Sequence, residues 1–359
     1  MRILSLYLAR EYIKTVGALA VLFVGIFTLF DFIEKIDNFH EAGVPTATVA
    51  AFFLLQLPEL LTLMLPMAVL LGTVITLGLM VKRNEIVAIK ASGISLLRFT
   101  LPIILVGTAC ALIVAGLNET VLPRTKAKTN FIWDVMVEKR PGRLFHNQKF
   151  WYKGHSSIYH VGYYDDTTHT LTNVVYYRFD RDFNLIMRID ARRARFLAGK
   201  WHFFSGLMQK RRPDGTYSAQ RFEEQTIDLP ERPGDFTRLV KPSDEMNFAE
   251  LNKYITKIEE EGYDSRRYRV DLHGKISFPF VCLIMALIGI PLALIKQKGD
   301  SMALSVILGV AGALLYWVSF SYVRSIFGYS GVLPPVIAAW MINAVFALAA
   351  LWLISTIRQ

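Results

Sequence analysis

The sequence contains few residues whose type and spacing suit catalysis. It has no GxxxxGK[ST] phosphate-binding loop, no GxGxxG turn after a strand and no HExxH zinc motif. Of the seven histidines, His155 and His160 lie closest together, at a spacing that does not suit ligands on one helical face. No nucleophile elbow occurs, although a Ser-His-Asp site assembled from distant residues stays open. We therefore expect no catalytic residue and no metal.

Ionisable residues within long apolar stretches are more informative. Each costs about 2.5–3.5 kcal/mol to insert at the centre of a bilayer, so those that occur usually have a function. Glu59, Glu119 and Arg324 all fall near the ends of apolar stretches, whereas a proton relay would need them at mid-depth. A proton-driven pump is therefore disfavoured. Glu59 follows Pro58 and either caps an apolar helix or has a functional role.

The segment KRNEIVAIKASGISLLR, residues 82–98, has the pattern of a short exposed amphipathic helix. Asn84 can begin this helix and Gly93 can end it. Such a helix either lies on the lipid surface or docks into a protein partner. Glu85 would be repelled by anionic lipid but attracted by an arginine of a protein, which favours docking.

Long apolar runs must position these residues. The 359 residues are 53% hydrophobic and 19% charged, and the uncharged ones are concentrated in runs. A bilayer-spanning helix needs about 20 largely apolar residues, because lipid cannot satisfy an exposed peptide group. The sequence therefore predicts an α-helical polytopic membrane protein and excludes a soluble enzyme. We expect six transmembrane helices, the first of them uncleaved, near residues 13–33, 59–81, 99–121, 275–295, 302–323 and 334–356.

The run over residues 44–81 is too long for one simple span and contains no polar turn. Pro58 is therefore expected to separate a short interfacial helix from the second span. Lysines and arginines in the short connecting segments predict the orientation. One set of segments holds only Lys35 and Arg324, and the opposite set holds Arg2, Arg10, Lys14, Lys82, Arg83, Lys90, Arg98, Lys296, Lys298 and Arg358. This bias predicts that both termini are cytoplasmic and that the large domain lies outside.

The polar stretch between the third and fourth spans has the pattern of strands. Short alternating segments are separated by turn residues such as Asp180–Asn184 and Asp214–Gly215, which predicts an all-β sandwich or roll. This domain either only adds stability or forms a groove that guides a ligand. The strands are expected near residues 150–152, 157–163, 171–179, 185–197, 200–208 and 221–229.

A helical period follows the strands. Asn247 and Glu250 can cap a helix that Gly262 ends, and a second short element at 264–274 leads into the fourth span. We expect these two elements to form a rigid hinge. The predicted domains are residues 1–123 with a cytoplasmic helix at about 84–93, the β domain 124–246, the linker helices 247–270 and the last three spans 271–359.

Cysteine and charge add two expectations. Cys110 and Cys282 both fall inside apolar runs, so we expect buried side chains and no disulfide framework. The net charge of +10 comes with dispersed basic residues and no finger, RNP or helix-turn-helix pattern. Nucleic acid is therefore not an expected partner.

Three stretches resemble the lipopolysaccharide-export permeases of the LptF/LptG family. They read LPELLTLMLPMAVLLGTVITLGLMVKRNEIVAIKASGIS at 57–95, YRVDLHGKISFPF at 268–280 and LPPVIAAWMINAVFALAALWL at 333–353. The order of three spans, a β-jellyroll and three spans agrees over essentially the whole chain. FWYKGHSSIYHVG and RIDARRARFLAGKW are more similar to the LptG branch than to the LptF branch.

The resemblance implies a permease subunit of an ABC transporter in the inner membrane of a Gram-negative bacterium. Such a transporter extracts lipopolysaccharide and passes it along periplasmic jellyrolls to a bridge. The implied partners are an LptB-like ATPase dimer, an LptF-like permease, an LptC-like single-span jellyroll protein and an LptA-like bridge. ATP and magnesium would be bound by the ATPase, so this chain is expected to have no cofactor and not to be an enzyme. The alternatives are an LptF-type paralogue, a permease for another lipid or lipoprotein, and a non-transporting anchor for a β scaffold.

The resemblance also implies two sets of site residues. Glu85 matches the family's coupling-helix glutamate, and the candidate ATPase contacts are Arg83, Glu85, Ile86, Ile89, Ser92 and Gly93. A multiply acylated, phosphorylated lipid needs an apolar cavity rimmed by cations. The rim candidates are Lys35, His40, Arg124, Lys126 and Lys128, and the wall candidates are Met64, Leu65, Tyr316 and Phe320.

One departure from the family concerns the first helix. Enterobacterial members carry lysines at the positions that match Glu34, His40 and Glu41, and only Lys35 remains nearby. The cluster at 124–128 is the expected substitute for phosphate contact. The family also suggests a lateral gate between the first and fifth spans.

Overall fold

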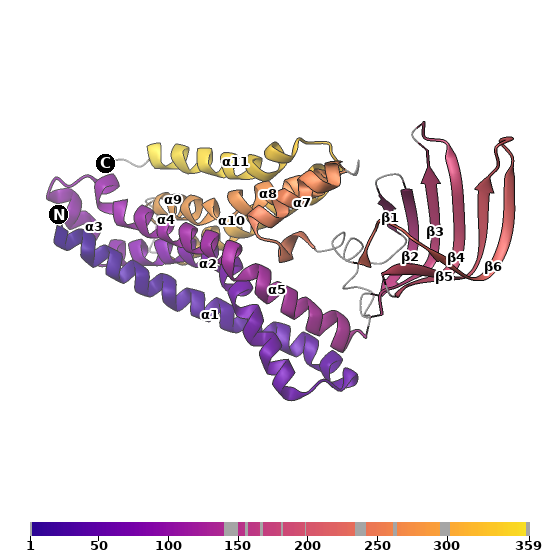
Figure 1. Ribbon diagram of the computed structural model, residues 1–359. Helices are drawn as coiled ribbons and strands as arrows, with labels where there is room; N and C mark the ends of the chain where they lie inside the picture. Colours follow the sequence, from indigo (N-terminus) through magenta and orange to yellow (C-terminus); the bar gives the residue numbers. More distant parts are fainter. Residues whose placement is uncertain are drawn as a thin grey trace. The chain divides into compact units, whose positions relative to one another are not determined.

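The computed structural model describes residues 2–139, 150–154, 157–165, 168–180, 182–197, 199–233, 242–260, 264–294 and 302–356. They form two compact units. The first is helical and contains the residues before Asn130 and from Ser243 onward, apart from Ala42–Val44; the second contains Asn130–Pro242 (Figure 1). Gly262, the predicted end of a helix, lies outside the described residues.

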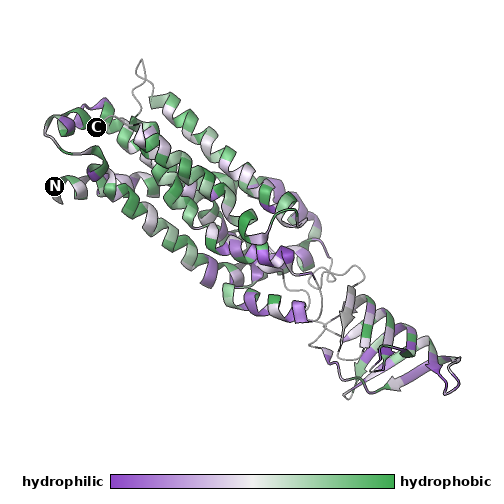
Figure 2. Ribbon diagram, turned by 90° about the horizontal axis from the view of Figure 1, so that it is seen from above, coloured by the Kyte–Doolittle hydropathy of each residue, from purple (hydrophilic) through white to green (hydrophobic). Residues whose placement is uncertain are grey.

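The helical unit contains the long apolar helices. The described helices are α1 (Arg2–Ala42), α2 (Thr46–Lys82), α3 (Glu85–Ala91), α4 (Leu96–Thr120), α5 (Leu122–Phe131), α7 (Phe248–Glu260), α8 (Arg266–Ser277), α9 (Phe280–Leu294), α10 (Met302–Tyr322) and α11 (Pro335–Ser355). Short helical turns add η4 (Ser243–Glu245) and η5 (Val323–Gly328), and η1 (Ile132–Val137) belongs to the second unit. Figure 2 shows hydrophobic residues along most of the helical unit and polar residues toward its ends.

The described residues contain five candidate membrane spans, and six if a bent pair of helices forms one span. Among the described residues, α1, α2, α4, α10 with η5, and α11 are each long and apolar enough to cross a membrane. Helices α8 and α9 pass the same test together, with a bend of 51° between them. This bent pair coincides with the fourth predicted span, and α8 coincides with the predicted short element that leads into it. The chain is a multi-pass membrane protein.

The predicted break at Pro58 is wrong. Helix α2 continues from Thr46 to Lys82 and contains both Pro58 and Pro66. A proline removes one helical hydrogen bond, a loss that dense packing can offset. Helix α2 is the central helix of its unit, since 72% of its most apolar window is buried against 11% for α1.

Small residues let the helices around α2 approach closely. A Cβ atom on Gly289 of α9 would lie 2.6 Å from the Thr73 Cβ of α2, so the contact depends on glycine. The Tyr12 hydroxyl donates to the Val69 carbonyl at 3.2 Å and fixes α1 to α2. Cys110 and Cys282 are buried and free in this core, as the sequence predicts.

The six predicted strand segments are confirmed in the second unit. The strands are β1 (Phe150–Lys153), β2 (Ser157–Asp165), β3 (Thr170–Phe179), β4 (Leu185–Leu197), β5 (Lys200–Arg211) and β6 (Tyr217–Ile227). They form one sheet in chain order, and every neighbouring pair is antiparallel. Each strand therefore pairs with the next through a hairpin.

The side chains on one face of the single sheet pack against one another and are buried. Leu171, Ile189, Trp201 and Phe203 are completely buried, and they belong to one cluster that is drawn from the strands and Leu229. A flat sheet would leave this face open unless another layer covered it, and the described residues of this unit contain no second sheet. The sequence predicted either a sandwich or a roll. The described strands agree with a roll, because they form one sheet.

A line of irregular positions crosses the roll. Asn173 in β3 and Ser205 in β5 have φ angles of +50° and +51°, and the strand register places both opposite Arg192 of β4. The alternation of buried residues shifts by one there, since Leu171 and Val174 are both buried. Positive φ angles bend a strand sharply, so this line is where the sheet changes direction.

Candidate functional site

Helix α3 occupies the short segment for which docking was predicted. It follows Asn84, which has a φ of +58° and forms no side-chain capping bond. Asn84 therefore serves as a tight turn after α2 rather than as the predicted side-chain cap, since asparagine tolerates this conformation. At the other end, Ser92 Oγ donates to the Ile89 carbonyl at 2.7 Å, and Gly93 has the positive φ that ends a helix.

The two faces of α3 differ from the prediction. Ile86 and Ile89 are only 5% and 6% exposed and belong to the core of the helical unit. They anchor α3 to its own chain and are not available to a partner. Val87 is the largest apolar residue exposed on α3, with 60% exposure. Glu85 is partly exposed beside the exposed Arg83, with 3.9 Å between Oε1 and Nη1.

Lys35 is held within the helical unit. Its Nζ lies 2.6 Å from Asp31 Oδ1 one turn earlier in α1, and 5.4 Å from the centre of the Phe52 ring of α2. His40 is exposed near the end of α1. The structure therefore presents His40 outward, whereas Lys35 already has an anionic partner.

The basic cluster on α5 divides between two faces. Lys126 Nζ lies 2.6 Å from Glu59 Oε1 and joins α5 to α2. Glu59 therefore sits inside α2 as an ion-pair partner and does not begin a span. Arg124 and Lys128 are exposed and one helical turn apart, so they share a face that Lys126 does not.

The predicted cavity wall is largely packed. Leu65, Tyr316 and Phe320 are buried in the core, and Met64 is half-buried. The Tyr316 hydroxyl donates to Asn343 Oδ1, and Asn343 Nδ2 donates to the Ser277 carbonyl at 2.6 Å. Tyr316 therefore connects α10, α11 and α8, and in this structure it is a core residue.

A buried polar network around Asp271 was not predicted. Asp271 Oδ1 accepts from Arg324 Nη2 at 2.9 Å and from the Tyr329 hydroxyl at 2.6 Å, and Oδ2 accepts from Ser243 Oγ at 2.6 Å. A Cβ atom on Gly274 would lie 2.9 Å from the Arg324 guanidinium, so glycine makes room for the arginine. Arg324, one of the ionisable residues near the end of an apolar stretch, therefore pairs with Asp271 of α8.

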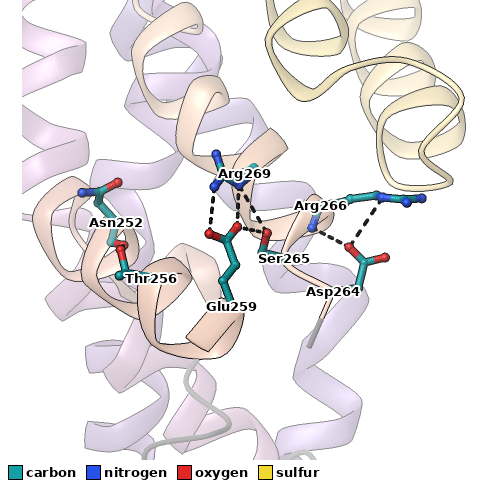
Figure 3. A network of polar contacts seen from close by, with 7 residues as sticks. All are labelled: Asn252, Thr256, Glu259, Asp264, Ser265, Arg266 and Arg269. Atoms are coloured by element: carbon teal, nitrogen blue, oxygen red, sulfur yellow. Dashed lines mark hydrogen bonds and ion pairs between the residues drawn. The ribbon is translucent and has the colours of Figure 1, made fainter. Parts of the chain in front are cut away.

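A second network joins α7 to α8 (Figure 3). Arg269 donates to Glu259 from Nε at 2.6 Å and from Nη2 at 2.8 Å, and the Ser265 hydroxyl donates to the same carboxylate. These hydrogen bonds lower the pKa of Glu259 to about 2, with the bond from Arg269 as the largest cause. The predicted cap of α7 is confirmed, because Asn247 Oδ1 accepts from the Glu250 amide at 2.8 Å. Together these contacts fit the predicted rigid hinge.

Glu231, which follows β6, forms hydrogen bonds with residues of β2 and β5. Its buried carboxylate accepts hydrogen bonds from Ser157 Oγ at 2.7 Å and from the Tyr159 hydroxyl, and its carbonyl accepts from Trp201 Nε1 at 2.8 Å. Burial, followed by the nearby carboxylate, raises the pKa of Tyr159, so its hydroxyl remains a donor. This contact holds the segment after β6 against β2.

These features together define the class. The candidate spans, the short helix between the second and third, and the β unit that follows the third are the architecture of a polytopic membrane protein with an inserted β domain. The family model described as "Lipopolysaccharide export system permease LptF/LptG" matches residues 6–356, and the chain belongs to this family.

Two relatives indicate the branch. The chain is similar to the lipopolysaccharide export system permease protein LptG of Escherichia coli K12, with 22% identity over 362 residues that cover 98% of each protein. It is 24% identical to LptG of Haemophilus influenzae over 370 residues, 99% of each. The chain is therefore LptG-like.

Proposed function

We propose that this chain is the LptG-type permease subunit of a lipopolysaccharide exporter in the inner membrane of a Gram-negative bacterium. It takes lipopolysaccharide from the membrane and passes it along the β unit toward a periplasmic bridge. ATP hydrolysis in a separate subunit drives the process. The observation that carries this proposal is the match of the family over residues 6–356 of a chain with five or six candidate spans and one β insert.

The orientation follows from charge and connectivity. Lysines and arginines in short loops favour the side that holds both termini and α3, which is the cytoplasm. A single span, α4, follows α3 and precedes the β unit. We therefore place α3 in the cytoplasm and the β unit in the periplasm.

The open face of α3 suits an ATPase partner. Glu85 is acidic and partly exposed, and Val87 offers an apolar contact beside it. A cationic groove on an LptB-like ATPase would complement this face, because charge-assisted hydrogen bonds from arginine to carboxylate are strong. ATP and magnesium belong to that subunit. We propose an LptB-like dimer below the membrane, an LptF-like permease and an LptC-like protein beside this chain, and an LptA-like bridge beyond it.

Two features support a phosphorylated lipid as cargo. Arg124 and Lys128 share an exposed face of α5 just beyond the end of α4, where lipid phosphates lie. Helix α1 leaves most of its apolar surface uncovered by this chain, and Val21, Phe27 and Phe30 are exposed there. Such a surface suits acyl chains or a partner span.

Co-expression with LptB-, LptF- and LptC-like subunits tests the proposal. We expect a stable complex that hydrolyses ATP and retains lipopolysaccharide, whereas this chain alone hydrolyses none. Glu85→Arg should reduce retention of the ATPase subunit at least tenfold. Glu260→Arg, an equal charge change at an exposed position of α7, should leave retention unchanged. A complex that retains the ATPase equally in both variants would refute the role of α3.

A further inference from the structure

A cleft of about 450 Å³ opens between α4 on one side and α8 and α9 on the other. Its walls are almost entirely apolar and include Leu112, Ala115, Phe280 and Leu283. None of the residues predicted to bind cargo or the ATPase lines it. A volume of this size suits part of a small amphiphilic molecule.

One end of the cleft is polar. Asn118 and Glu119 lie in the last turns of α4, and Lys275 lies in the last turn of α8. Glu119 Oε2 accepts from the Phe248 amide at 2.8 Å, which fixes the first turn of α7 at the same end. The cleft therefore matches an amphiphilic lipid, because its polar end suits a head group and its apolar walls suit an acyl chain.

Among the described residues, Lys275 has no direct ionic partner in the cleft, although the carboxylates of Asp244, Glu119 and Asp271 act on its ammonium from a longer distance. Its side chain is half-buried, and within the described part of the chain no carboxylate lies within ion-pair distance of its ammonium. An ammonium withdrawn from water is costly unless a charged partner and hydrogen bonds compensate it. A phosphate at the mouth of the cleft would supply both.

The length of the cleft indicates a lipid rather than a helix. Its lining on α4 runs from Thr108 to Glu119, which is about 16 Å at 1.5 Å per residue. That is about half of a hydrocarbon core roughly 30 Å thick, so the cleft spans one leaflet. A partner's transmembrane helix would need a groove across both leaflets.

We propose that this cleft binds a resident glycerophospholipid. One acyl chain lies along α4 and α9, and the phosphate accepts hydrogen bonds from Lys275. The site is separate from the cargo path proposed above and does not depend on it. A multiply acylated cargo would exceed a cleft of this volume.

Lipid retention by the purified full-length chain tests the proposal. The probe is dioleoylphosphatidylglycerol, added in non-ionic detergent and counted by native mass spectrometry. Lys275→Gln removes the charge and keeps a polar side chain, and Ala115→Trp fills the cleft and keeps the charge. We expect each variant to weaken binding at least fivefold, and dioleoylglycerol, which lacks the phosphate, to bind the unaltered chain at least fivefold more weakly.

The control is Lys253→Gln, which removes an exposed lysine of α7 outside the cleft and should leave binding unchanged. Equal binding by the unaltered chain and both cleft variants would overturn the proposal. Equal binding of the phospholipid and dioleoylglycerol would also overturn it.

A photoreactive residue in place of Leu112 distinguishes the occupants in native membranes. Leu112 lines the cleft and is 69% exposed. The expected adduct is a glycerophospholipid, and it should decrease in the Lys275→Gln background. A predominant adduct with a polypeptide or with lipopolysaccharide would refute a resident phospholipid.

Discussion

At the scale of single residues, Asp271 and Arg324 form a largely buried ion pair in the helical unit, with 24% of the Arg324 side chain and 10% of the Asp271 side chain exposed. Removal of one member of a buried pair costs about 3–5 kcal/mol, because the other charge is left uncompensated. We therefore expect Asp271→Asn to lower the unfolding temperature of the purified chain markedly, as measured by thermal aggregation. Asp264→Asn breaks the exposed pair with Arg266 and should cost at most about 1 kcal/mol. An equal loss in both variants would contradict this account of Asp271.

Glu259 makes a prediction about pH. Its pKa falls from 4.5 in the unfolded chain to about 2 in the folded one. A lowered carboxyl pKa stabilises the fold above pH 4.5, and this contribution is lost as the pH falls from 4.5 through 2. The difference in unfolding temperature between the unaltered chain and Glu259→Gln should therefore be largest at pH 7 and small at pH 2.5. A difference that is the same at both pH values would exclude the ion pair with Arg269 as its source, and Glu260→Gln controls for loss of a nearby exposed carboxylate.

Sequence alone predicts residue contacts only where they are local. The cap formed by Asn247 and Glu250 spans three residues, so its spacing is readable from the chain. Asp271 and Arg324 are 53 residues apart, and only the packing of η5 against α8 brings them together. The one signal available was an arginine near an apolar stretch, which calls for an anionic partner without identifying it.

At the scale of elements, the two faces of helix α3 are expected to have different roles: the buried face stabilises the fold, and the exposed face binds the ATPase subunit. Ile86→Ala should cost about 2–5 kcal/mol, because Ile86 fills the core, whereas Val87→Ala should cost under about 0.5 kcal/mol. Val87→Asp should instead reduce retention of the ATPase subunit without lowering the unfolding temperature. Thermal aggregation of the chain alone and pull-down of the complex measure the two effects. Loss of assembly in Ile86→Ala with an unchanged unfolding temperature would reverse the two faces.

For α3, the existence of the helix was predictable from the sequence, but the face that it buries was not. The apolar residues of α3 indicate an amphipathic helix, but Ile86, Val87 and Ile89 fit either face until the position of the core is known. Similarly, Pro58 usually ends a helix, and only the dense surroundings of α2 explain why the helix continues. In the β unit, alternation predicted the strands, but Asn173 and Ser205 gave no signal of a bend across them.

At the scale of the whole molecule, the order of apolar runs and strands was sufficient to predict six spans and one insert. The residues at which the two units begin and end are harder to predict from the sequence. Helix α5 carries the chain beyond α4 in helical form, so the β unit begins near Asn130, whereas the sequence suggested 124. Its other end lies at Pro242, because η4 already packs with the helices through Ser243.

Membrane orientation gives a prediction at this scale. Val87→Cys on α3 and Phe183→Cys in the turn before β4 both place a thiol at an exposed position, and the two native cysteines are buried. With a membrane-impermeant maleimide, Phe183→Cys should react in spheroplasts, and Val87→Cys should react only in inverted vesicles. Labelling of Val87→Cys in spheroplasts would place α3 out of reach of a cytoplasmic ATPase.

The most direct test of a lipid permease driven by a separate subunit is transfer itself. Proteoliposomes would contain lipopolysaccharide, this chain and its LptF-, LptC- and LptB-like partners, with an LptA-like acceptor outside. We predict that ATP causes lipopolysaccharide to crosslink first to the β unit and then to the acceptor, and that Glu85→Arg abolishes both signals. Transfer that proceeds without ATP, or that persists without the ATPase subunit, would contradict the account.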